Sequence, residues 1–333
     1  MIKVLLVGAG TMGEVHAEAY MKMKDAEVIG VADWSEDRRR ELAAKLGAAP
    51  FKELSEALAS LEEVDIVDIC LATDKHGDAV KISADYGAAV ICEKPLARSL
   101  EEAEELITYC ENKRTTLFVG HVLRFFHEYV SIKDRLDNGE IGMPGVVRTF
   151  RGGAFPEGMN NWYADVEKSG GLILDMIIHD FDFLRWCFGE VERVYARSLT
   201  DRLKDKMDYA LVTLKFKNGI LAHVEGSWAH EGFNTAFEAA GKEGIIDFDS
   251  SRDKSLILQQ KCVTKNGGGV EVPASAVEDS PYYLELRHFL DCFQTGAEPI
   301  VNARDAAEAI RISLAALESA RQKKPVYIGE ELK

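Results

Sequence analysis

Residues 2–20 read IKVLLVGAGTMGEVHAEAY, and this stretch decides the fold. The apolar run Lys3–Gly8 predicts a buried strand, and the segment Thr11–Met23 predicts the helix that follows it. Glycines stand at positions 8, 10 and 13, with the spacing Gly-x-Gly-x-x-Gly at the junction. Such glycines let the backbone turn tightly and approach a pyrophosphate at a helix N-terminus. The motif Gly8, Gly10, Thr11, Met12 and Gly13 is therefore a predicted dinucleotide-binding turn.

Apolar runs alternate with amphipathic segments as far as about residue 124, which is typical of parallel strands joined by crossover helices. We expect a Rossmann domain with a doubly wound parallel sheet over residues 1–123. Its predicted strands are Lys3–Gly8, Val28–Asp33, Asp65–Ala72, Ala89–Glu93 and Leu117–Gly120, with a weaker one at Ala49–Phe51. Its predicted helices are Thr11–Met23, Ser35–Leu46, His76–Tyr86 and Ser99–Cys110.

Beyond residue 125, strand-like runs follow one another with turns between them, which favours antiparallel sheet. Tyr209–Phe216 and Leu221–Trp228 flank Lys217-Asn218-Gly219, a strong hairpin signal. In this hairpin Val212, Leu214 and Phe216 should share one face, and Thr213, Lys215 and Lys217 the other. A second α+β domain is expected over residues 124–333. Its other predicted elements are the strands Phe237–Ala240 and Ile245–Asp249, and the helices Gly170–Cys187, Tyr282–Phe293 and Ala303–Gln322.

Composition narrows the class of protein. A chain of 333 residues with 47% hydrophobic and 29% charged residues is long enough for two globular domains. The net charge of −16 disfavours nucleic acid as a partner, since binding needs clustered Lys and Arg. No apolar run approaches the roughly 18 residues of a membrane span, and the start does not resemble a signal peptide. We expect a cytoplasmic protein that does not bind membranes.

Six cysteines are spread along the chain without a Cys-x-x-Cys pair, so no metal site or redox pair is encoded locally. We interpret them as reduced, mostly buried thiols, and we expect no bound metal. They are Cys70, Cys92, Cys110, Cys187, Cys262 and Cys292.

Asp33 ends the second predicted strand, where an acidic side chain accepts hydrogen bonds from the adenosine ribose hydroxyls. This position favours NAD over NADP as the cofactor. Arg38–Arg40 offer an alternative, because an arginine there would reach a 2′-phosphate, although their helical position favours solvated surface. Trp34 is expected to cover the adenine pocket, and the alternative is a partly exposed aromatic at a strand end.

Polar side chains mark the remainder of the candidate site. Lys94 lies in Glu93-Lys94-Pro95 at the carboxyl end of a predicted strand, the edge of the sheet where ligands of such folds bind. Asp175 and His179 lie four residues apart in the predicted helix Gly170–Cys187, which places both on one face. A histidine on an apolar helix is often only a core residue, but together these three side chains form a convergent acid/base group.

In these motifs the chain resembles the glucose-fructose oxidoreductase, inositol dehydrogenase and rhizopine catabolism (Gfo/Idh/MocA) family over nearly its whole length. The resemblance rests on the glycine motif and on five further blocks, of which Gly120-His121 with Arg124-Phe125 counts as one. They are Ala72-Thr73-Asp74-Lys75-His76, Glu93-Lys94-Pro95-Leu96, Gly120-His121, Arg124-Phe125, Gly170-Gly171 with Asp175, His179 and Asp182, and Gly296–Pro299.

The resemblance implies a large, open, mainly antiparallel sheet in the second domain, which shapes the substrate pocket and mediates assembly. It implies a homodimer or homotetramer, a cis Lys94-Pro95 bond, and Lys94, Asp175 and His179 as the catalytic set. Thr73, His76 and Glu93 would contact the cofactor together with Lys94. Many members have Pro-Asn where this chain has Asp74-Lys75, which puts the cofactor contact there in doubt.

We therefore predict an NAD-dependent oxidoreductase that transfers hydride between nicotinamide and a secondary hydroxyl of a sugar, cyclitol or sugar derivative. His179 would be the base, since the ordinary pKa of imidazole is about 6.5, and Lys94 would stabilise the alkoxide. Arg124, Trp162 and Tyr283 are candidates for the pocket wall, each with a purely structural alternative. The alternative functions are a nucleotide-sugar 3-dehydrogenase or reductase, and a non-catalytic NAD(P)-binding sensor.

Overall fold

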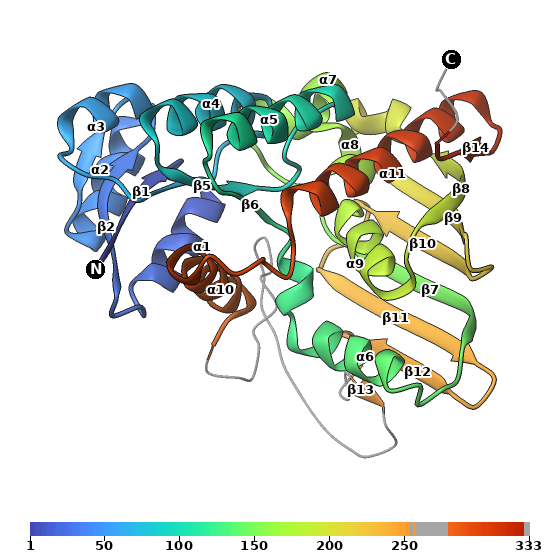
Figure 1. Cartoon of the computed structure of the whole chain (residues 1–333). Coiled ribbons are helices and arrows are strands. Elements are labelled where there is room, and N and C mark those ends of the chain that lie inside the picture. The colour runs from blue at the N-terminus through green and yellow to red at the C-terminus, as the bar shows by residue number, and fades with distance from the viewer. Residues whose placement is uncertain (253–255, 258–278, 330–333) are drawn as a thin grey trace. The chain divides into compact units, whose positions relative to one another are not determined.

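The computed structural model describes residues 1–252, 256–257 and 279–329 (Figure 1). Contacts group them into two compact units. Unit 1 comprises Met1–Phe125 and the described part of Ser275–Ala307, and unit 2 comprises the described parts of Phe126–Ala274 and Glu308–Lys333. These units are defined by contacts and not by continuous sequence, so the predicted division into domains 1–123 and 124–333 stays a prediction.

Unit 1 contains a six-stranded parallel sheet in the order β3-β2-β1-β4-β5-β6, which is the Rossmann order. The predicted doubly wound sheet is thus confirmed, and its central strands β1, β4, β5 and β6 are almost entirely buried between helices. The strands are β1 Ile2–Val7, β2 Ala26–Ala32, β3 Ala49–Phe51, β4 Ile66–Ile69, β5 Ala89–Glu93 and β6 Leu117–Gly120.

The helices of unit 1 follow the predicted segments closely, and α3 is an additional one. Gly47 and Gly87 end α2 and α4 in the left-handed conformation, and the Ser99 side chain caps α5 by accepting from the Glu102 amide. The helices are α1 Thr11–Tyr20, α2 Glu36–Leu46, α3 Leu54–Ser60, α4 His76–Tyr86, α5 Leu100–Lys113 and α10 Pro281–Thr295. The 3₁₀ turns are η1 Thr73–Lys75 and η2 Val122–Phe125.

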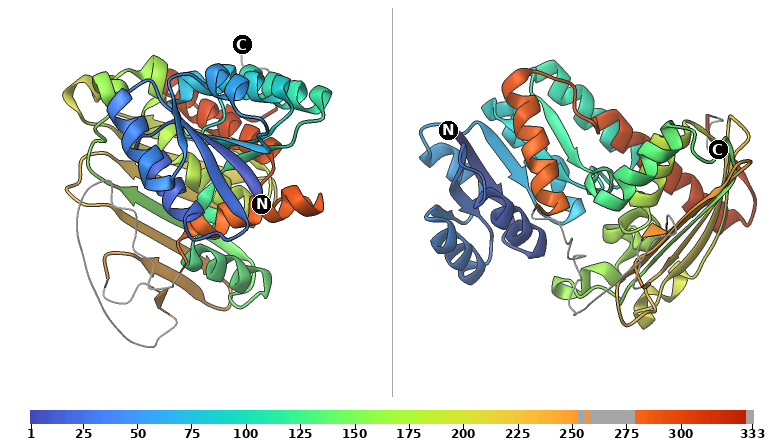
Figure 2. Two further views of the ribbon diagram at one scale, coloured as in Figure 1. Left: turned by 90° about the vertical axis from the view of Figure 1, so that its left-hand side faces the viewer. Right: turned by 90° about the horizontal axis from the view of Figure 1, so that it is seen from below.

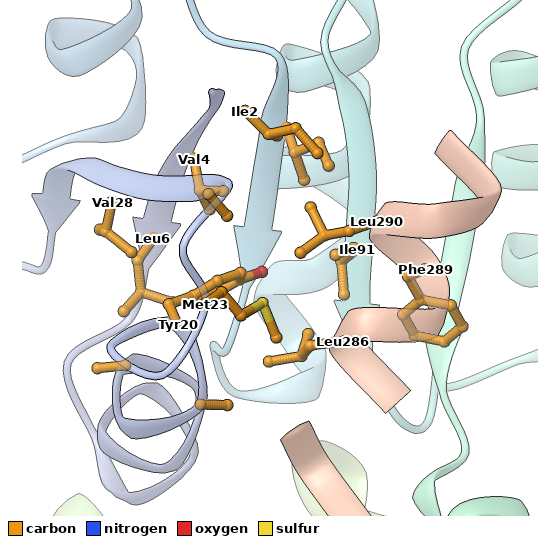
Figure 3. Packing of buried hydrophobic residues seen from close by; sticks show 14 of the residues in the cluster. Ile2, Val4, Leu6, Tyr20, Met23, Val28, Ile91, Leu286, Phe289 and Leu290 are labelled. Carbon is orange, nitrogen blue, oxygen red and sulfur yellow. The ribbon is translucent and has the colours of Figure 1, made fainter. Parts of the chain in front are cut away.

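A helix from far along the chain completes the core of unit 1. Leu286, Phe289 and Leu290 of α10 are fully buried in the same apolar cluster as β1 and α1 (Figure 3). The Phe289 ring stacks on Phe118 of β6, with 4.9 Å between their centres. Since α1 and α10 cover the face opposite α4 and α5 (Figure 1), the sheet is buried on both sides.

Unit 2 is built on an eight-stranded sheet in the order β13-β12-β11-β7-β10-β9-β8-β14. Every neighbouring pair is antiparallel except β7 and β10, so the predicted mainly antiparallel sheet is confirmed. The strands are β7 Pro144–Gly152, β8 Val191–Ser198, β9 Tyr209–Phe216, β10 Leu221–Ser227, β11 Asn234–Gly241, β12 Ile245–Asp249, β13 Leu256–Ile257 and β14 Val326–Tyr327.

The predicted hairpin is β9 with β10, and its faces are as expected. Val212, Leu214 and Phe216 are fully buried, whereas Thr213 and Lys215 are partly exposed. Helices of the same unit cover the buried face (Figure 2), and the Phe188 ring lies 5.8 Å from the ring of Phe216. The helices and 3₁₀ turns are α6 His127–Asp137, η3 Met159–Ala164, α7 Val166–Ser169, α8 Gly171–Asp175, α9 Ile178–Phe188, η4 Thr200–Asp205 and α11 Ala303–Gln322, whose first residues belong to unit 1.

The structure also bears on membrane-spanning helices and on the state of the cysteines. Within the part that the structure describes, no helix is both long and apolar enough to cross a membrane. Cys70, Cys92, Cys110, Cys187 and Cys292 carry free thiols, whereas Cys262 lies outside the described residues.

Candidate active site

The turn between β1 and α1 can be built only with glycine at two of its positions. Gly8 has a φ of +105°, and a Cβ added to it would lie 2.4 Å from the carbonyl oxygen of Cys70. A Cβ on Gly13 would lie 1.9 Å from the carbonyl oxygen of Gly8. The packing of strand against helix therefore requires both glycines, whether or not a ligand binds.

Gly10 is different, because nothing in the packing of the chain requires a glycine there. Its φ is −88°, and the nearest atom to an added Cβ would be Nη1 of Arg38, at 4.0 Å. Gly10 is also the N-cap of α1, and no side chain caps the helix. Open space beside uncapped N–H groups fits the pyrophosphate of a dinucleotide, so the residues present suit NAD. Thr11 is exposed at the start of α1, and Met12 packs against the core.

Asp33 directly follows β2 and holds the glycine turn. Its Oδ2 accepts a hydrogen bond of 2.8 Å from the Ala9 amide, and its Oδ1 accepts one of 2.7 Å from the Ser35 amide. Each oxygen keeps a second lone pair for a ribose hydroxyl. Trp34 is 58% exposed beside it.

The three arginines of α2 have different surroundings. Arg39 donates to the carbonyl oxygens of Asp33 and Trp34, and Arg40 pairs with Glu36 on the surface. Arg38 is the arginine whose guanidinium lies nearest to Gly10. If any of the three contacts a bound phosphate, Arg38 is the best placed.

The end of β5 presents one accessible side chain. Within Ala88–Ala97, all of which the structure describes, Lys94 alone is not buried. The Lys94-Pro95 bond is cis, as predicted. Because the carboxyl ends of β1, β4 and β5 share one edge of the parallel sheet, Lys94 lies at the same edge as the glycine turn.

His76 and Thr73, the other predicted cofactor contacts in unit 1, are both buried. The ring of His76 lies between two backbone carbonyls, with Nδ1 at 2.9 Å from the oxygen of Pro95 and Nε2 at 3.0 Å from that of Leu71. Burial lowers the pKa of His76, so its neutral ring donates to one carbonyl at a time. These contacts make His76 a support for the Pro95 segment. Asp74 and Lys75, the departure from the family pattern, form an ion pair with each other.

The structure corrects the predicted helix Gly170–Cys187. Gly170 and Gly171 both have positive φ, α8 ends at Asp175, and α9 begins only at Ile178. The Ile177 amide bonds to the carbonyl of Leu172, five residues back, so the regular ladder is interrupted. Ile177 and Leu172 pack against Gly226 of β10 at this point. Spacing of four therefore does not place Asp175 and His179 on one helical face, and the sequence-based argument for their alignment was wrong.

Exposure nevertheless sets these two residues apart. Within Gly171–Leu184, every residue of which the structure describes, Asp175 and His179 alone are not buried. Their neighbour Asp180 is buried in an ion pair with Arg151 of β7, with 2.6 Å between Oδ2 and Nε. Asp182 is buried as well. The first turn of α9 is thus anchored to the sheet while His179 keeps contact with solvent.

The three candidates for the pocket wall, Arg124, Tyr283 and Trp162, each contact other residues of the protein. Arg124 is buried, and its Nη1 donates to the Ile300 carbonyl and to Asp305, which supports its structural alternative. Tyr283 packs against the core of unit 1, and Trp162 contacts the ring of Tyr163 in unit 2. Since Lys94 belongs to unit 1 while Asp175 and His179 belong to unit 2, the convergence of the catalytic set stays a prediction.

One feature of unit 1 that the sequence analysis missed is a buried polar cluster beneath the sheet edge. His16 Nδ1 lies 2.8 Å from Oδ2 of Asp68, and the Tyr20 hydroxyl donates to the same oxygen over 2.9 Å. On its other side, Nε2 of His16 makes an ion-pair contact of 3.2 Å with Oε1 of Glu93. A signal was present: His16 and Tyr20 are four apart on one helix, and Asp68 interrupts an apolar strand.

The charges in this cluster follow from its burial. Burial, the largest single influence, lowers the pKa of His16, but the charge and hydrogen bond of Asp68 together with the contacts of Cys70 hold the pKa well above its usual value. Burial raises the pKa of Glu93, and the close contact with His16, together with the charge and backbone amide of Lys94, more than offsets this effect. The Cys70 thiol is also close enough for these atoms to hold a metal ion, but burial raises its pKa to about 12. A protonated thiol in a hydrogen-bonded group indicates an ionic network, and our expectation of no bound metal is unchanged.

Comparison with known proteins agrees with this architecture. Residues 2–121 match the model of an oxidoreductase family with an NAD-binding Rossmann fold, and residues 129–247 match the GFO/IDH/MocA C-terminal domain. The chain belongs to the Gfo/Idh/MocA family of oxidoreductases.

Relatives of this Gfo/Idh/MocA protein match it from end to end. Myo-inositol 2-dehydrogenase of Thermotoga maritima is 31% identical, with 99% of each chain covered. The scyllo-inositol 2-dehydrogenase (NAD(+)) of Bacillus subtilis is 29% identical over 98% of this chain and 96% of its own. A crystal structure of a probable dehydrogenase from Thermotoga maritima is 30% identical and superposes with a TM-score of 0.84, covering 99% of both chains. The family and the NAD-binding fold predicted from the sequence are confirmed.

Gly10 yields a test of the cofactor turn in this Gfo/Idh/MocA protein. Gly10→Ala should leave the thermal midpoint unchanged, because its Cβ meets no atom of the chain closer than 4.0 Å. The methyl group would occupy the space assigned to pyrophosphate, so the dissociation constant for NAD should rise by about tenfold or more, or about 1.4 kcal/mol. Tryptophan fluorescence titration measures it.

Two further glycines provide the controls. Gly145→Ala also adds a methyl group to open space, in β7 of unit 2, and should change neither quantity. Gly13→Ala should lower the thermal midpoint, because its Cβ would collide with the Gly8 carbonyl. Unchanged NAD affinity in Gly10→Ala would show that pyrophosphate does not approach this turn.

Proposed function

We propose that this NAD-dependent dehydrogenase oxidises a secondary hydroxyl of an inositol-like cyclitol or a related sugar. The observation that carries the proposal is the selective exposure of Lys94 and of Asp175 with His179, each within an otherwise buried segment. A charged side chain that keeps solvent contact in such surroundings is available to a ligand. The full-length relatives that are inositol 2-dehydrogenases support the choice of substrate class.

The proposed roles follow from the chemistry of these side chains. His179 accepts the proton of the substrate hydroxyl, and the cationic Lys94 stabilises the negative charge that develops on that oxygen. Asp175 orients the substrate or the ring of His179. NAD, when bound, accepts the hydride from the same carbon, so that a ketone is formed. The glycine turn and Asp33 would hold the cofactor through its pyrophosphate and adenosine ribose.

Two alternatives from the sequence remain distinct. The first is action on a nucleotide-sugar, or reduction as the working direction; the second is an NAD(P)-binding sensor without turnover. The presence of Lys94 and His179 in accessible positions favours catalysis over sensing.

Assembly and location are proposed on less specific grounds. The family resemblance supports a homodimer or homotetramer. A second ground is the face of the β9–β10 hairpin opposite the helices, where Leu211 is 42% exposed and Leu221 is 38% exposed. The buried face of the hairpin is covered by the unit's own helices, so it provides no argument for assembly. Free thiols at the described cysteines support a reducing, cytoplasmic location.

The assembly proposal predicts a mass in solution of two or four chains of 36.9 kDa at micromolar concentration. Light scattering after size-exclusion chromatography measures this mass. Leu211→Glu should shift it towards the monomer, because a charge would then have to be buried in the interface. Ile82→Glu, on an exposed position of α4, is the control. A monomeric wild-type protein would contradict the proposal.

For the catalytic set, Lys94→Ala and His179→Ala should each reduce kcat by roughly a hundredfold or more and leave NAD affinity nearly unchanged. Because both side chains act on one transition state, the double variant should be little slower than the slower single variant. Steady-state kinetics and NAD titration measure these effects.

Exposed residues of the same types provide the controls. Lys113→Ala and His127→Ala, on the surfaces of α5 and α6, should keep wild-type turnover. Wild-type turnover of His179→Ala between pH 6 and 9 would make His179 a structural residue and refute this mechanism.

A substrate panel tests the function as a whole. We expect NADH formation with myo-inositol or scyllo-inositol exceeding that with glucose, xylose or UDP-sugars, and NAD bound more tightly than NADP because of Asp33. Absorbance at the nicotinamide band follows the reaction. Equal or tighter NADP binding would refute the role of Asp33 and point to Arg38, which Arg38→Ala with Arg40→Ala as control would test. No turnover of any substrate with either cofactor would favour the sensor.

A further inference from the structure

His16 stands between two parts of the candidate site. It lies in the second turn of α1, the helix that begins at the glycine turn, and its ring is 1% exposed. Nδ1 faces Asp68 at 2.8 Å, and Nε2 faces Glu93 at 3.2 Å. These two carboxylates explain the orientation of the imidazole ring, because each ring nitrogen faces one of them.

The side chain of Glu93 connects His16 to the backbone of Lys94. The carboxylate of Glu93 has two oxygens with different neighbours: Oε1 contacts His16, and Oε2 accepts a hydrogen bond of 3.0 Å from the backbone amide of Lys94. Gly120 at the end of β6 lies beside this carboxylate, and even a Cβ there would make only an ordinary contact of 3.4 Å with Oε1. The group that holds the Lys94 backbone is thus itself held by His16.

The Asp68 side of the cluster keeps the ring in place. Asp68 is fully buried, and its Oδ2 is bonded both to His16 and to the hydroxyl of Tyr20. Tyr20 is packed in the apolar core beside Leu286 of α10 (Figure 3). An imidazole fixed at one nitrogen by a rigid carboxylate presents its other nitrogen in one direction, which is the requirement for a positioning group.

We propose that His16 is a positioning residue of the reaction: it holds the carboxylate of Glu93, and through it the backbone of Lys94, at the end of β5. The inference rests on the proposed catalytic role of Lys94. It assigns to α1 a second task besides the cofactor turn, because the same helix then also fixes the strand end that carries the lysine.

The charges supply an independent signature. In the wild type His16 lowers the pKa of Glu93, whereas burial, the largest single influence, raises it. Without the histidine, burial should raise the pKa of Glu93 above its usual value. The other groups around these carboxylates are Lys94, Cys92, Cys70 and His76 near Glu93, and Tyr20 and Cys70 near Asp68, with Glu285 of α10 facing Tyr20.

The test uses His16→Asn in the full-length protein. The asparagine amide can replace Nδ1 at Asp68 but cannot reach Glu93. With NAD and myo-inositol, kcat should fall at least tenfold while the NAD dissociation constant changes less than threefold. The rate relative to that of the wild type should also decline as the pH falls from 7 to 5. Protonation of His179 slows both proteins alike, whereas Glu93 becomes protonated in this range only in the variant.

Two variants identify the cause. His16→Gln, whose longer amide can reach Glu93, should recover most of the lost kcat. Glu93→Gln should lose kcat as His16→Asn does, but without the new decline at acid pH, because its amide does not titrate.

Hydrogen exchange of the protein without cofactor gives a readout that needs no activity. In His16→Asn, amides of the segment Ala89–Ala97 should exchange at least tenfold faster, while those of the hairpin Tyr209–Ser227 remain unchanged. Wild-type kcat, pH profile and exchange in His16→Asn would overturn the proposal, and a lower thermal midpoint alone would show a purely structural role. If instead Lys94→Ala keeps wild-type turnover, the catalytic assignment fails first, and the positioning role falls with it.

Discussion

The close approach of α1 to β1 sets the geometry on which the site depends. The carbonyl of Gly8 lies where a side chain of Gly13 would stand, so strand and helix meet with nothing but backbone between them. This contact fixes the direction of α1, leaves its first amides uncapped at the sheet edge, and brings Ala9 within reach of Asp33. It also fixes His16 in the second turn of α1, beside Asp68 of β4 and Glu93 of β5. A dinucleotide turn and a buried ionic cluster thus share one geometric origin.

Both units bury charged side chains that have oppositely charged partners beside them. Transferring ions from water into an apolar interior costs several kcal/mol each unless each finds partners. In unit 1, His16 lies between Asp68 and Glu93; in unit 2, Arg151 neutralises Asp180 beside His179. In both units, the paired groups are buried and the adjacent residue, Lys94 or His179, keeps contact with solvent. The ionic groups therefore stabilise the backbone next to the accessible side chains.

Most of the strands and helices could be predicted from the sequence, because the spacing of apolar residues and the positions of turn residues determine local structure. The β5 strand was identified by its continuous apolar run, the hairpin Tyr209–Ser227 by Asn218-Gly219, and α11 by the helical spacing of its apolar residues. The interruption between Asp175 and Ile178 was not, since the interval contains no proline and the cause is tertiary packing of Ile177 on Gly226. The His16 cluster was also missed, because its members lie 52 residues apart in the chain and meet only through the sheet order. The contacts of α10 with unit 1 were missed for the same reason.

The position of α10 has a consequence for how the protein is made. Leu286, Phe289 and Leu290 complete the apolar core of unit 1, yet they are synthesised after every strand of the unit 2 sheet except β14. While the ribosome translates residues 126–280, α1 already covers part of this face of the unit 1 sheet, but the part that α10 will cover is open to water or to chaperones. The final folding of the first unit therefore waits until α10 has been synthesised, and a chain stalled before α10 would expose that apolar surface to its neighbours.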